Sequence, residues 1–176
     1  MEERRDARGL TEAEAIARYR SRNYPKPALT ADIVVLARRE ETLQILLVER
    51  GGHPFIGKLA LPGGFANEDE PVEKTAAREL EEETGVAGLP MELVGVFSHP
   101  GRDPRGWVVS VAFAAVVDSS ELSVRAGDDA AAALWYQIEE TASGWGLRRG
   151  EEMVPIEELA FDHARIIRQT LQKLKL

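Results

Sequence analysis

The sequence predicts an α+β fold in which a mixed β-sheet is sandwiched between α-helices. Two observations lead to this prediction: β-prone runs dominate the central part of the chain, and only a few segments carry a helical pattern. Because strands and helices do not alternate regularly, the pattern favours an α/β/α sandwich over a series of βαβ repeats. The length of 176 residues suits one domain with a terminal helix added to it.

The N-terminal segment is expected to form a helix ahead of the main domain. Thr11, followed three residues later by Glu14, forms a capping-box pattern and predicts a helix over residues 11–22. The PKP segment that follows ends this helix and forms a hinge. We therefore predict an N-terminal helix and linker over residues 1–27 and one folded domain over residues 28–176.

Several β-prone runs predict the strands. Residues 30–37 and 43–49 are split by a polar stretch and are expected to pair as a hairpin. Further strands are expected at 59–61, 91–97, 107–117 and 133–137. Residues 138–152 show no regular pattern and are expected to be irregular, with a last strand edge within EMVPIEEL.

Two more helices are expected, one central and one at the end of the chain. Residues 71–84 contain Pro71, which suits a first turn, and precede Gly85, which suits the residue after a helix. Three apolar residues recur at intervals of four and predict its buried face: Val72, Ala76 and Leu80. The tail FDHARIIRQTLQKLKL is amphipathic and predicts the last helix.

Composition excludes several classes of function. The formal net charge of −8 predicts a surface that repels nucleic acid and anionic membranes. The chain contains no cysteine, which excludes disulfides and thiol nucleophiles and fits a cytoplasmic protein. No apolar run is long enough to span a membrane. We expect a cytoplasmic protein with no nucleic-acid or membrane partner.

A cluster of glutamates stands at the end of the predicted central helix. Glu79, Glu82 and Glu83 are spaced i, i+3 and i+4 and share one face, where the helix dipole is already negative. Mg²⁺ or Mn²⁺ would compensate this charge, because hard cations prefer carboxylate oxygens. Arg78 is placed to pair with Glu82, whereas Glu81 lies on another face. The alternative interpretation is a solvated acidic face.

A longer motif surrounds this cluster. Gly64 is followed after five residues by Glu70, and after seven more by RELEEETGV, which begins at Arg78 and includes Gly85. This pattern closely resembles the Nudix box of the Nudix hydrolases, with every defining position filled. The resemblance extends over roughly residues 29–138, with weaker likeness in the tail.

The resemblance implies a Nudix fold and the hydrolysis of a nucleoside diphosphate linked to another moiety. It implies that Glu79, Glu82 and Glu83, with the Gly64 carbonyl, hold divalent metals that activate water and neutralise the diphosphate. The resemblance also implies that Glu70 and Arg78 support the geometry of the box. Gly85 permits a left-handed conformation at the end of the helix. The general base is left open between a box glutamate and an acid in AGDDAA, either Asp128 or Asp129, for which a solvated turn is the alternative.

Segments outside the box resemble the ADP-ribose pyrophosphatase branch, which would cleave ADP-ribose to AMP and ribose 5-phosphate. They are VERGGHPFIGKLALPGGF and SHPGRDPRGWVVSVAF. Arg50, Arg102 and Arg105 are predicted substrate contacts, because guanidinium groups suit bidentate phosphate binding. Gly64 is a further predicted substrate contact, because backbone at a glycine can approach a ligand closely. The alternatives are a surface ion pair for Arg50 and a turn residue for Arg105.

Histidines and aromatic residues give weaker indications. The three histidines, His53, His99 and His163, lack a shared metal-ligand spacing and are interpreted as loop or capping residues. Three aromatic residues are candidates to stack on an adenine, namely Phe55, Trp107 and Trp135, although strand tryptophans are more often core residues.

Three rival functions stay open. The substrate could be an oxidised nucleoside triphosphate, NADH or a nucleotide sugar. The chain could instead be a non-catalytic ADP-ribose sensor, as in relatives with a DNA-binding winged helix, or a binding module with a silent site. No basic helix-turn-helix pattern follows the last predicted core strand, which argues against the regulator. The N-terminal helix could pack in a homodimer or be a frayed terminus.

Overall fold

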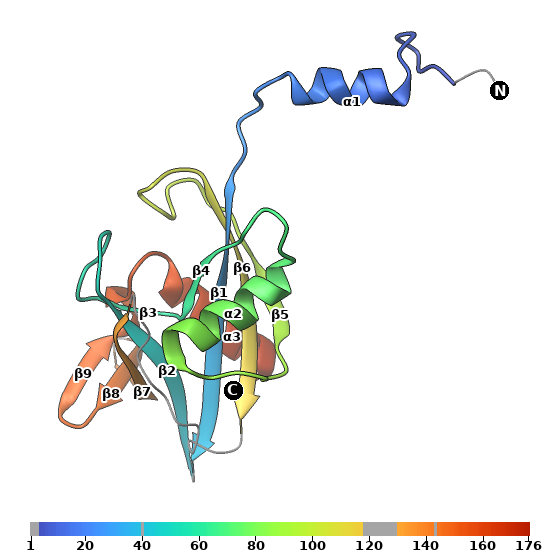
Figure 1. The fold of residues 1–176 in the computed structure, drawn as a ribbon. Helices are drawn as coiled ribbons and strands as arrows, with labels where there is room; N and C mark the ends of the chain where they lie inside the picture. The colour runs from blue at the N-terminus through green and yellow to red at the C-terminus, as the bar shows by residue number, and fades with distance from the viewer. Residues whose placement is uncertain (1–3, 40, 118–129, 143) are drawn as a thin grey trace.

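A computed structural model of the protein describes residues 4–39, 41–117, 130–142 and 144–176. Figure 1 shows one sheet with α2 in front of it and α3 behind it. The elements in chain order are α1 (Glu12–Arg20), β1 (Ala28–Arg39), β2 (Thr42–Arg50), β3 (Leu59–Ala60), β4 (Gly63–Phe65), α2 (Val72–Thr84), β5 (Glu92–Phe97), β6 (Val108–Val117), β7 (Ala130–Thr141), β8 (Gly144–Arg149), β9 (Glu152–Pro155), a 3₁₀ turn η1 (Ile156–Glu158) and α3 (His163–Leu174). The predicted α+β architecture with a mixed sheet is confirmed.

Most of the predicted elements are present, and one prediction is wrong. The β1–β2 hairpin, the central strands and all three helices lie where the sequence places them. The segment 138–152 is not irregular, because β7 runs on to Thr141 and pairs with β8, which pairs with β9. Gly144 and Gly150 both have positive φ, and such residues suit the tight turns between antiparallel strands.

The sheet has the strand order β5-β6-β1-β2-β7-β8-β9. β1 runs parallel to β6 over Ala28–Ala37, and the other pairings along this path are antiparallel. The two short strands are attached to the central ones, β3 to β2 and β4 to β1. The sheet is therefore mixed, with β1 near its centre.

Helices cover both faces of β1, which explains its uninterrupted buried run. Ala31, Ile33 and Val35 pack with Ala76 and Leu80 of α2. On the opposite face, the alternate β1 residues and α3 contribute to a larger cluster that includes Val34, Leu36, Ile166, Ile167 and Leu171. This alternation follows the two-residue period of a strand. A strand covered on both faces needs apolar residues throughout rather than at every second position.

β1 and β2 separate along their length. They pair only near their connecting turn, from Leu36–Ile45 to Arg39–Thr42. Further along, β1 pairs instead with β4 over Thr30–Asp32, and β2 pairs with β3. The separation leaves a space between the two halves of the sheet, into which polar residues from both strands project.

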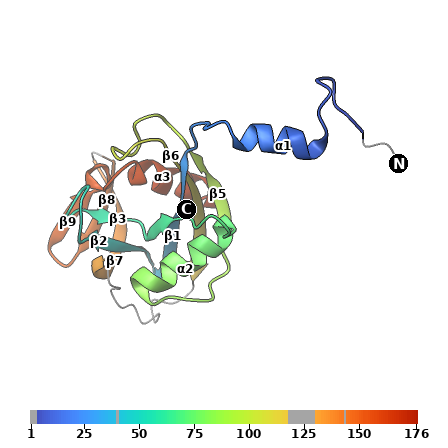
Figure 2. The same cartoon turned by 45° about the horizontal axis from the view of Figure 1, so that its top comes forward.

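The N-terminal helix α1 stands apart from the sheet in both views (Figures 1 and 2). Its predicted capping box is present: Thr11 Oγ1 accepts from the Glu14 backbone, and Glu14 accepts from the Thr11 backbone. None of the α1 residues is buried. The division of the chain after residue 27 stays a prediction. Within the described ranges, no helix combines the length and apolar character needed to cross a bilayer.

Candidate functional site

A pocket of about 600 Å³ occupies the space where β1 and β2 separate. Residues from both strands, from the β3–β4 connection, from α2 and from the loop before β6 line it. The lining side chains that carry charge or can bind a phosphate or a metal are Asp32, Glu49, Arg50, His53, Arg78, Glu79, Glu83, Arg102, Asp103, Arg105 and His163. Carboxylates therefore share one cavity with guanidinium groups.

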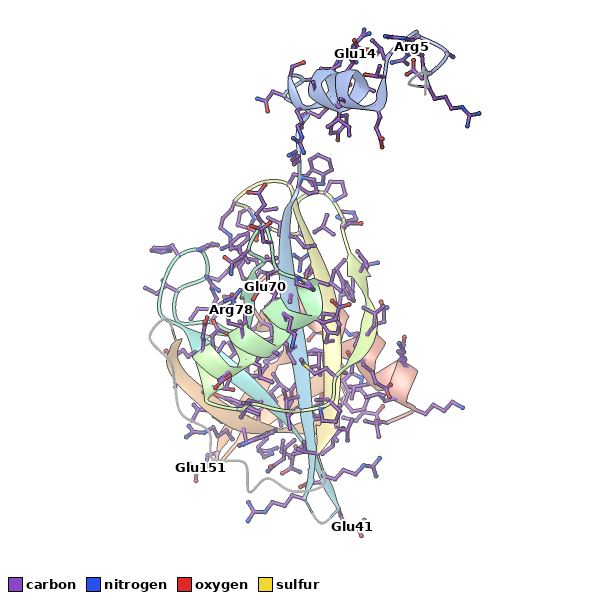
Figure 3. All side chains as sticks on the ribbon, turned by 45° about the vertical axis from the view of Figure 1, so that its right-hand side comes forward. Arg5, Glu14, Glu41, Glu70, Arg78 and Glu151 are labelled. Carbon is purple, nitrogen blue, oxygen red and sulfur yellow. The ribbon has the colours of Figure 1, made fainter. Side chains whose placement is uncertain are left out.

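Arg78 joins the acidic residues around α2. Its Nε and Nη2 atoms donate to the two oxygens of Glu70 at 3.0 and 2.9 Å, and Nη1 donates to Glu79 at 2.6 Å and Glu82 at 3.0 Å. Nη2 also donates to the Phe65 carbonyl. Figure 3 labels the Arg78–Glu70 pair beside α2. The Arg78 hydrogen bonds lower the pKa of Glu70 to about 2.

Glu79 and Glu83 direct their carboxylates toward the pocket. Glu79 lies against Gly64, where a Cβ atom would overlap its carboxylate. Glu83 accepts a 2.9 Å hydrogen bond from the Gly63 N–H, its one hydrogen-bond donor in the part of the chain described. Burial raises the pKa of Glu83 to about 7 and also raises the pKa of Glu79. Both carboxylates are thus partly removed from water; Glu79 is paired with Arg78, whereas among the described residues Glu83 has only the Gly63 N–H as a hydrogen-bond donor.

Glu82 differs from the other two glutamates. Its side chain is 58% exposed, pairs with Arg78 and lies outside the pocket lining. Consistent with this position, the described ranges hold no ready-made group of three or more acidic, histidine or cysteine ligands. The donors still fit a hard divalent cation, because Glu79, Glu83 and the Gly64 backbone supply oxygen ligands at one wall and Glu82 stands at its edge.

The conformation and charge at the end of α2 determine where the glutamates of this wall lie. Gly85 has φ 71° and its N–H donates to the Glu81 carbonyl at 2.8 Å, so the predicted left-handed helix end is present. The last turn of α2 has no basic residue to offset the dipole. Arg78, one turn earlier, is the cation that offsets it.

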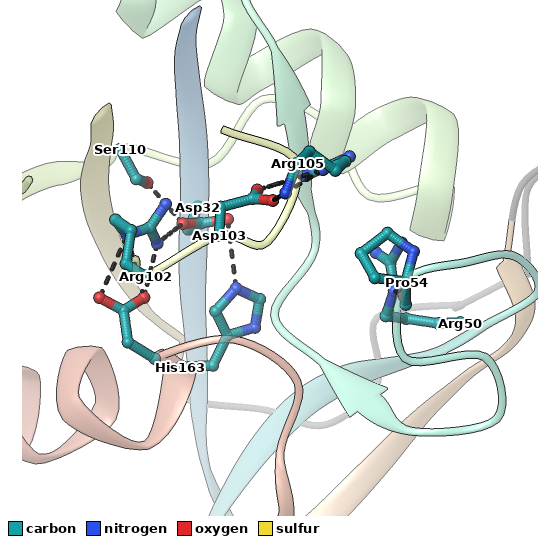
Figure 4. Close-up of polar contacts among 9 residues, drawn as sticks. Asp32, Arg50, Pro54, Arg102, Asp103, Arg105, Ser110 and His163 are labelled. Atoms are coloured by element: carbon teal, nitrogen blue, oxygen red, sulfur yellow. Dashed lines mark hydrogen bonds and ion pairs between the residues drawn. The ribbon is translucent and has the colours of Figure 1, made fainter. Parts of the chain in front are cut away.

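The opposite wall contains a buried charge network (Figure 4). Arg102, whose side chain is 4% exposed, donates to Asp162 at 2.6 Å and to Asp32 at 3.4 Å. Ser110 Oγ donates to Asp32 at 2.5 Å. Because two carboxylates already occupy the Arg102 guanidinium, its position favours a supporting role, and its predicted substrate contact stays a prediction.

His163 completes this network at the start of α3. Its Nδ1 accepts a 2.9 Å hydrogen bond from the Leu61 N–H, and its Nε2 lies 3.6 Å from Asp32 Oδ1. Burial lowers the pKa of the imidazole, so the neutral form is favoured, with its proton on Nε2. The interaction ties the helix end to the loop that leads into β4.

Arg50 and Arg105 approach the pocket from different segments. Arg50 Nε donates to the Pro54 carbonyl at 2.7 Å, and its guanidinium carbon lies 4.9 Å from the Phe161 ring centre. Arg105 pairs with Asp103 at 2.6 Å and lies 4.7 Å from the Phe65 ring centre. Burial, and then the nearby charge of Arg105, lower the pKa of Arg50.

The structure brings most of the predicted site residues together, although their roles stay predictions. Sequence reasoning missed Asp32, Asp162 and Phe161, and interpreted His163 only as a loop or capping residue. Among the adenine-stacking candidates, Phe55 packs beside the pocket wall, whereas Trp107 is 57% exposed and Trp135 packs in the α2 cluster. The base candidates Asp128 and Asp129 lie outside the described residues.

Sequence comparisons place the chain among known proteins. A model of the NUDIX domain family matches residues 26–171. An ADP-ribose pyrophosphatase of Methanocaldococcus jannaschii is 38% identical over 151 residues, which cover 86% of this chain and 77% of that protein. The ADPR responsive transcriptional repressor NtrR of Acinetobacter baylyi is 30% identical over 93% of this chain, a match that spans only 61% of the repressor.

The solved structures that resemble the chain include Nudix proteins as well. A MutT/nudix family protein from Enterococcus faecalis has a TM-score of 0.81 at 36% identity, covering 95% of this chain and 70% of its own. The NUDIX domain of Shewanella oneidensis NrtR, complexed with ADP ribose, has a TM-score of 0.77 at 32% identity, covering 94% and 99%. A bifunctional NMN adenylyltransferase/ADP ribose pyrophosphatase from Francisella tularensis, complexed with AMP and a Mn ion, has a TM-score of 0.65 at 26% identity, covering 92% and 46%.

Substitution of the two adjacent glycines is expected to have different effects. A Cβ at Gly63, where φ is 152°, would overlap the Ala31 carbonyl oxygen and lie 2.9 Å from the Asp32 Cα. Gly63→Ala should therefore cost more than about 3 kcal/mol of unfolding free energy. A Cβ at Gly64 would instead overlap the Glu79 carboxylate, a side-chain end that can shift although Arg78 binds it, so Gly64→Ala should cost less, about 1 kcal/mol. Urea denaturation measures the unfolding free energy of both variants. Equal losses of stability would contradict the difference in backbone crowding between Gly63 and Gly64.

Removal of the buried Glu83 charge should stabilise the protein when divalent cations are chelated. A pKa of about 7 in the folded state, above the ordinary 4.5, means that the wild type loses stability as pH rises through this interval. In EDTA, Glu83→Gln should gain on the order of 2 kcal/mol at pH 8 and little at pH 5. Thermal unfolding at both pH values tests this expectation. The exposed Glu81→Gln is the matched control, and a gain independent of pH would refute the assigned burial.

Proposed function

The chain belongs to the NUDIX domain family and is a Nudix pyrophosphohydrolase, and from this premise we propose that it hydrolyses ADP-ribose to AMP and ribose 5-phosphate with Mg²⁺ or Mn²⁺. The observation that carries the proposal is the pocket between β1 and β2. Its α2 wall presents Glu79 and Glu83, and guanidinium groups from Arg50 and Arg105 face the same space. A diphosphate needs both kinds of group, a cation held by carboxylates and direct cationic partners.

The size of the pocket and the relatives support the choice of substrate. A volume of about 600 Å³ falls within the range of pockets that bind small molecules of nucleotide size. The ADP-ribose pyrophosphatase relative and the neighbour complexed with ADP ribose favour this substrate over other nucleoside diphosphate compounds. The neighbour complexed with AMP and a Mn ion supports a divalent cation.

The proposed chemistry assigns separate roles to the two walls. A divalent cation, when bound, would neutralise the diphosphate and make a water molecule more acidic. Glu79, Glu82, Glu83 and the Gly64 carbonyl would hold that cation, and Arg78 keeps the first two glutamates in place. Arg50 and Arg105 would orient the phosphates for in-line attack. Water then adds across the P–O–P bond, so that one product gains the hydroxyl group and the other gains the proton.

A second candidate is an ADP-ribose-binding module without turnover. It is favoured by the 30% identity to the repressor and by the likeness to the NrtR NUDIX domain. Such a module would bind ADP-ribose in the same pocket and release no product. A different Nudix substrate, such as NADH, a nucleotide sugar or an oxidised nucleoside triphosphate, is the other alternative. The cytoplasmic location and a homodimer stay predictions.

Hydrolysis of a substrate panel tests the proposal. Phosphatase-coupled phosphate release should be fastest for ADP-ribose in a set with NADH, diadenosine polyphosphates, nucleotide sugars and oxidised dGTP, and EDTA should abolish it. Glu82→Gln or Glu83→Gln should abolish turnover while the fold is retained, because each removes a charged cation ligand. Glu81→Gln should keep full activity, because this exposed side chain lies outside the pocket. Full activity of the two ligand variants would exclude the metal assignment, and binding without any hydrolysis would favour the sensor.

Arg105→Ala tests which part of the substrate this wall recognises. Arg105 stands between the Phe65 and Phe161 rings at the pocket wall, and we assign it to the ribose phosphate of ADP-ribose. KM for ADP-ribose should rise by about tenfold, the loss of one charge-assisted contact, and KM for a nucleoside triphosphate should rise less. Steady-state kinetics on both substrates measure the difference. Equal changes would mean that Arg105 does not distinguish the ribose side.

A further inference from the structure

Two phenylalanines beside the pocket have left-handed backbone conformations. Phe55, between β2 and β3, has φ 64°, and Phe161, just before α3, has φ 55°. The other non-glycine residue with positive φ in the described ranges is Lys175, at the end of α3. Bulky residues rarely adopt this conformation, and those that do concentrate at functional sites. The pair therefore calls for an explanation in terms of what the two rings contact.

The two rings contact each other across the pocket wall. Their centroids lie 4.9 Å apart with an interplanar angle of 68°, an edge-to-face arrangement that is favourable for aromatic pairs. Both rings pack on a small separate cluster formed by Val48, Ala60 and Ala160. These contacts fix the Phe161 ring, which also lines the pocket.

Two guanidinium groups lie against the fixed Phe161 ring. The guanidinium carbon of Arg50 lies 4.9 Å from its centroid, and that of Arg105 lies 5.3 Å from it. Arginines prefer aromatic faces because the ring quadrupole attracts cations. The two like charges repel each other, and their attraction to the ring offsets part of this repulsion. The ring therefore gives two arginines from separate segments a common position.

The charge of this pair is only partly compensated. Asp103 binds Arg105 through both carboxylate oxygens. Arg50 uses only its Nε atom, toward the Pro54 carbonyl, and its two terminal nitrogens make no hydrogen bond to any described residue. A half-buried guanidinium with free donors, beside a second guanidinium, is a site for an anion with several oxygens.

We propose that Phe161 is a positioning residue that holds Arg50 and Arg105 together as a preformed binding site for a phosphate group. For the identity of the natural ligand, this inference rests on the proposed function, in which the phosphate belongs to the diphosphate of the substrate. Phe161 itself need not touch the phosphate. It acts by fixing the two guanidinium groups before the ligand arrives, which lowers the ordering cost of binding.

Binding of inorganic pyrophosphate tests the inference without turnover. Calorimetric titration in EDTA probes the arginines and leaves out any cation. The wild type should bind pyrophosphate, and Phe161→Leu, which keeps an apolar side chain but loses the ring, should weaken binding about tenfold. Phe161→Tyr should restore it. Phe97→Leu, a buried phenylalanine outside the pocket, is the control for a general loss of packing. If Phe161→Leu does not fold, Phe161→Met serves in its place.

A double-mutant comparison separates positioning from packing. In a background with Arg50→Ala and Arg105→Ala, Phe161→Leu should weaken pyrophosphate binding no further. In turnover assays, Phe161→Leu should raise KM by a similar factor and leave kcat within about twofold. The inference is overturned if the wild type does not bind pyrophosphate, if Phe161→Leu binds as the wild type does, or if its effect persists without the arginines. A wild type that binds pyrophosphate in a Phe161-dependent way but does not hydrolyse ADP-ribose would overturn the proposed substrate only.

Discussion

The Arg78 guanidinium is the interaction on which the acidic wall depends. A helix that ends in several carboxylates, with no basic residue in its last turn, is destabilised by its own dipole. Arg78 offsets this charge by binding Glu70 ahead of the helix together with Glu79 and Glu82 on it. A lysine could not do the same, because only a planar guanidinium offers five donors in fixed directions. The wall can therefore be arranged before any cation binds.

The second constraint is the change of partner along β1. Its first half pairs with β4 and its second half with β2, so the sheet opens without leaving an unpaired strand in its centre. Asp32 lies in the half that pairs with β4, and its carboxylate meets Arg102 and Ser110. An opening of this kind exposes backbone and side-chain polar groups to a cavity rather than to a packed core. The pocket thus follows from the topology: α2 supplies the Glu79 and Glu83 carboxylates, and the end of β2 and the loop before β6 supply guanidinium groups.

The parts of the site that the sequence predicted are those with local signals. Helical spacing places Glu79 and Glu83 on one face, and a glycine after a helix predicts the left-handed conformation of Gly85. Phe161 and His163 carried no such signal, because an amphipathic tail predicts a helix but not where its first residues dock. The same limit applies to β8, whose short, glycine-containing sequence has little strand character until its neighbours pair with it.

The residues that dock the start of α3 also form part of the pocket, so ligand binding and helix docking affect each other. Ala160 donates to the Leu59 carbonyl, His163 accepts from Leu61, and Phe161 supports the arginine wall. Pocket occupancy and docking of the start of α3 are therefore linked equilibria. A ligand that needs these residues in place adds its binding free energy to helix attachment. The ligand-bound protein should therefore hold the first turn of α3 more firmly than the free protein does.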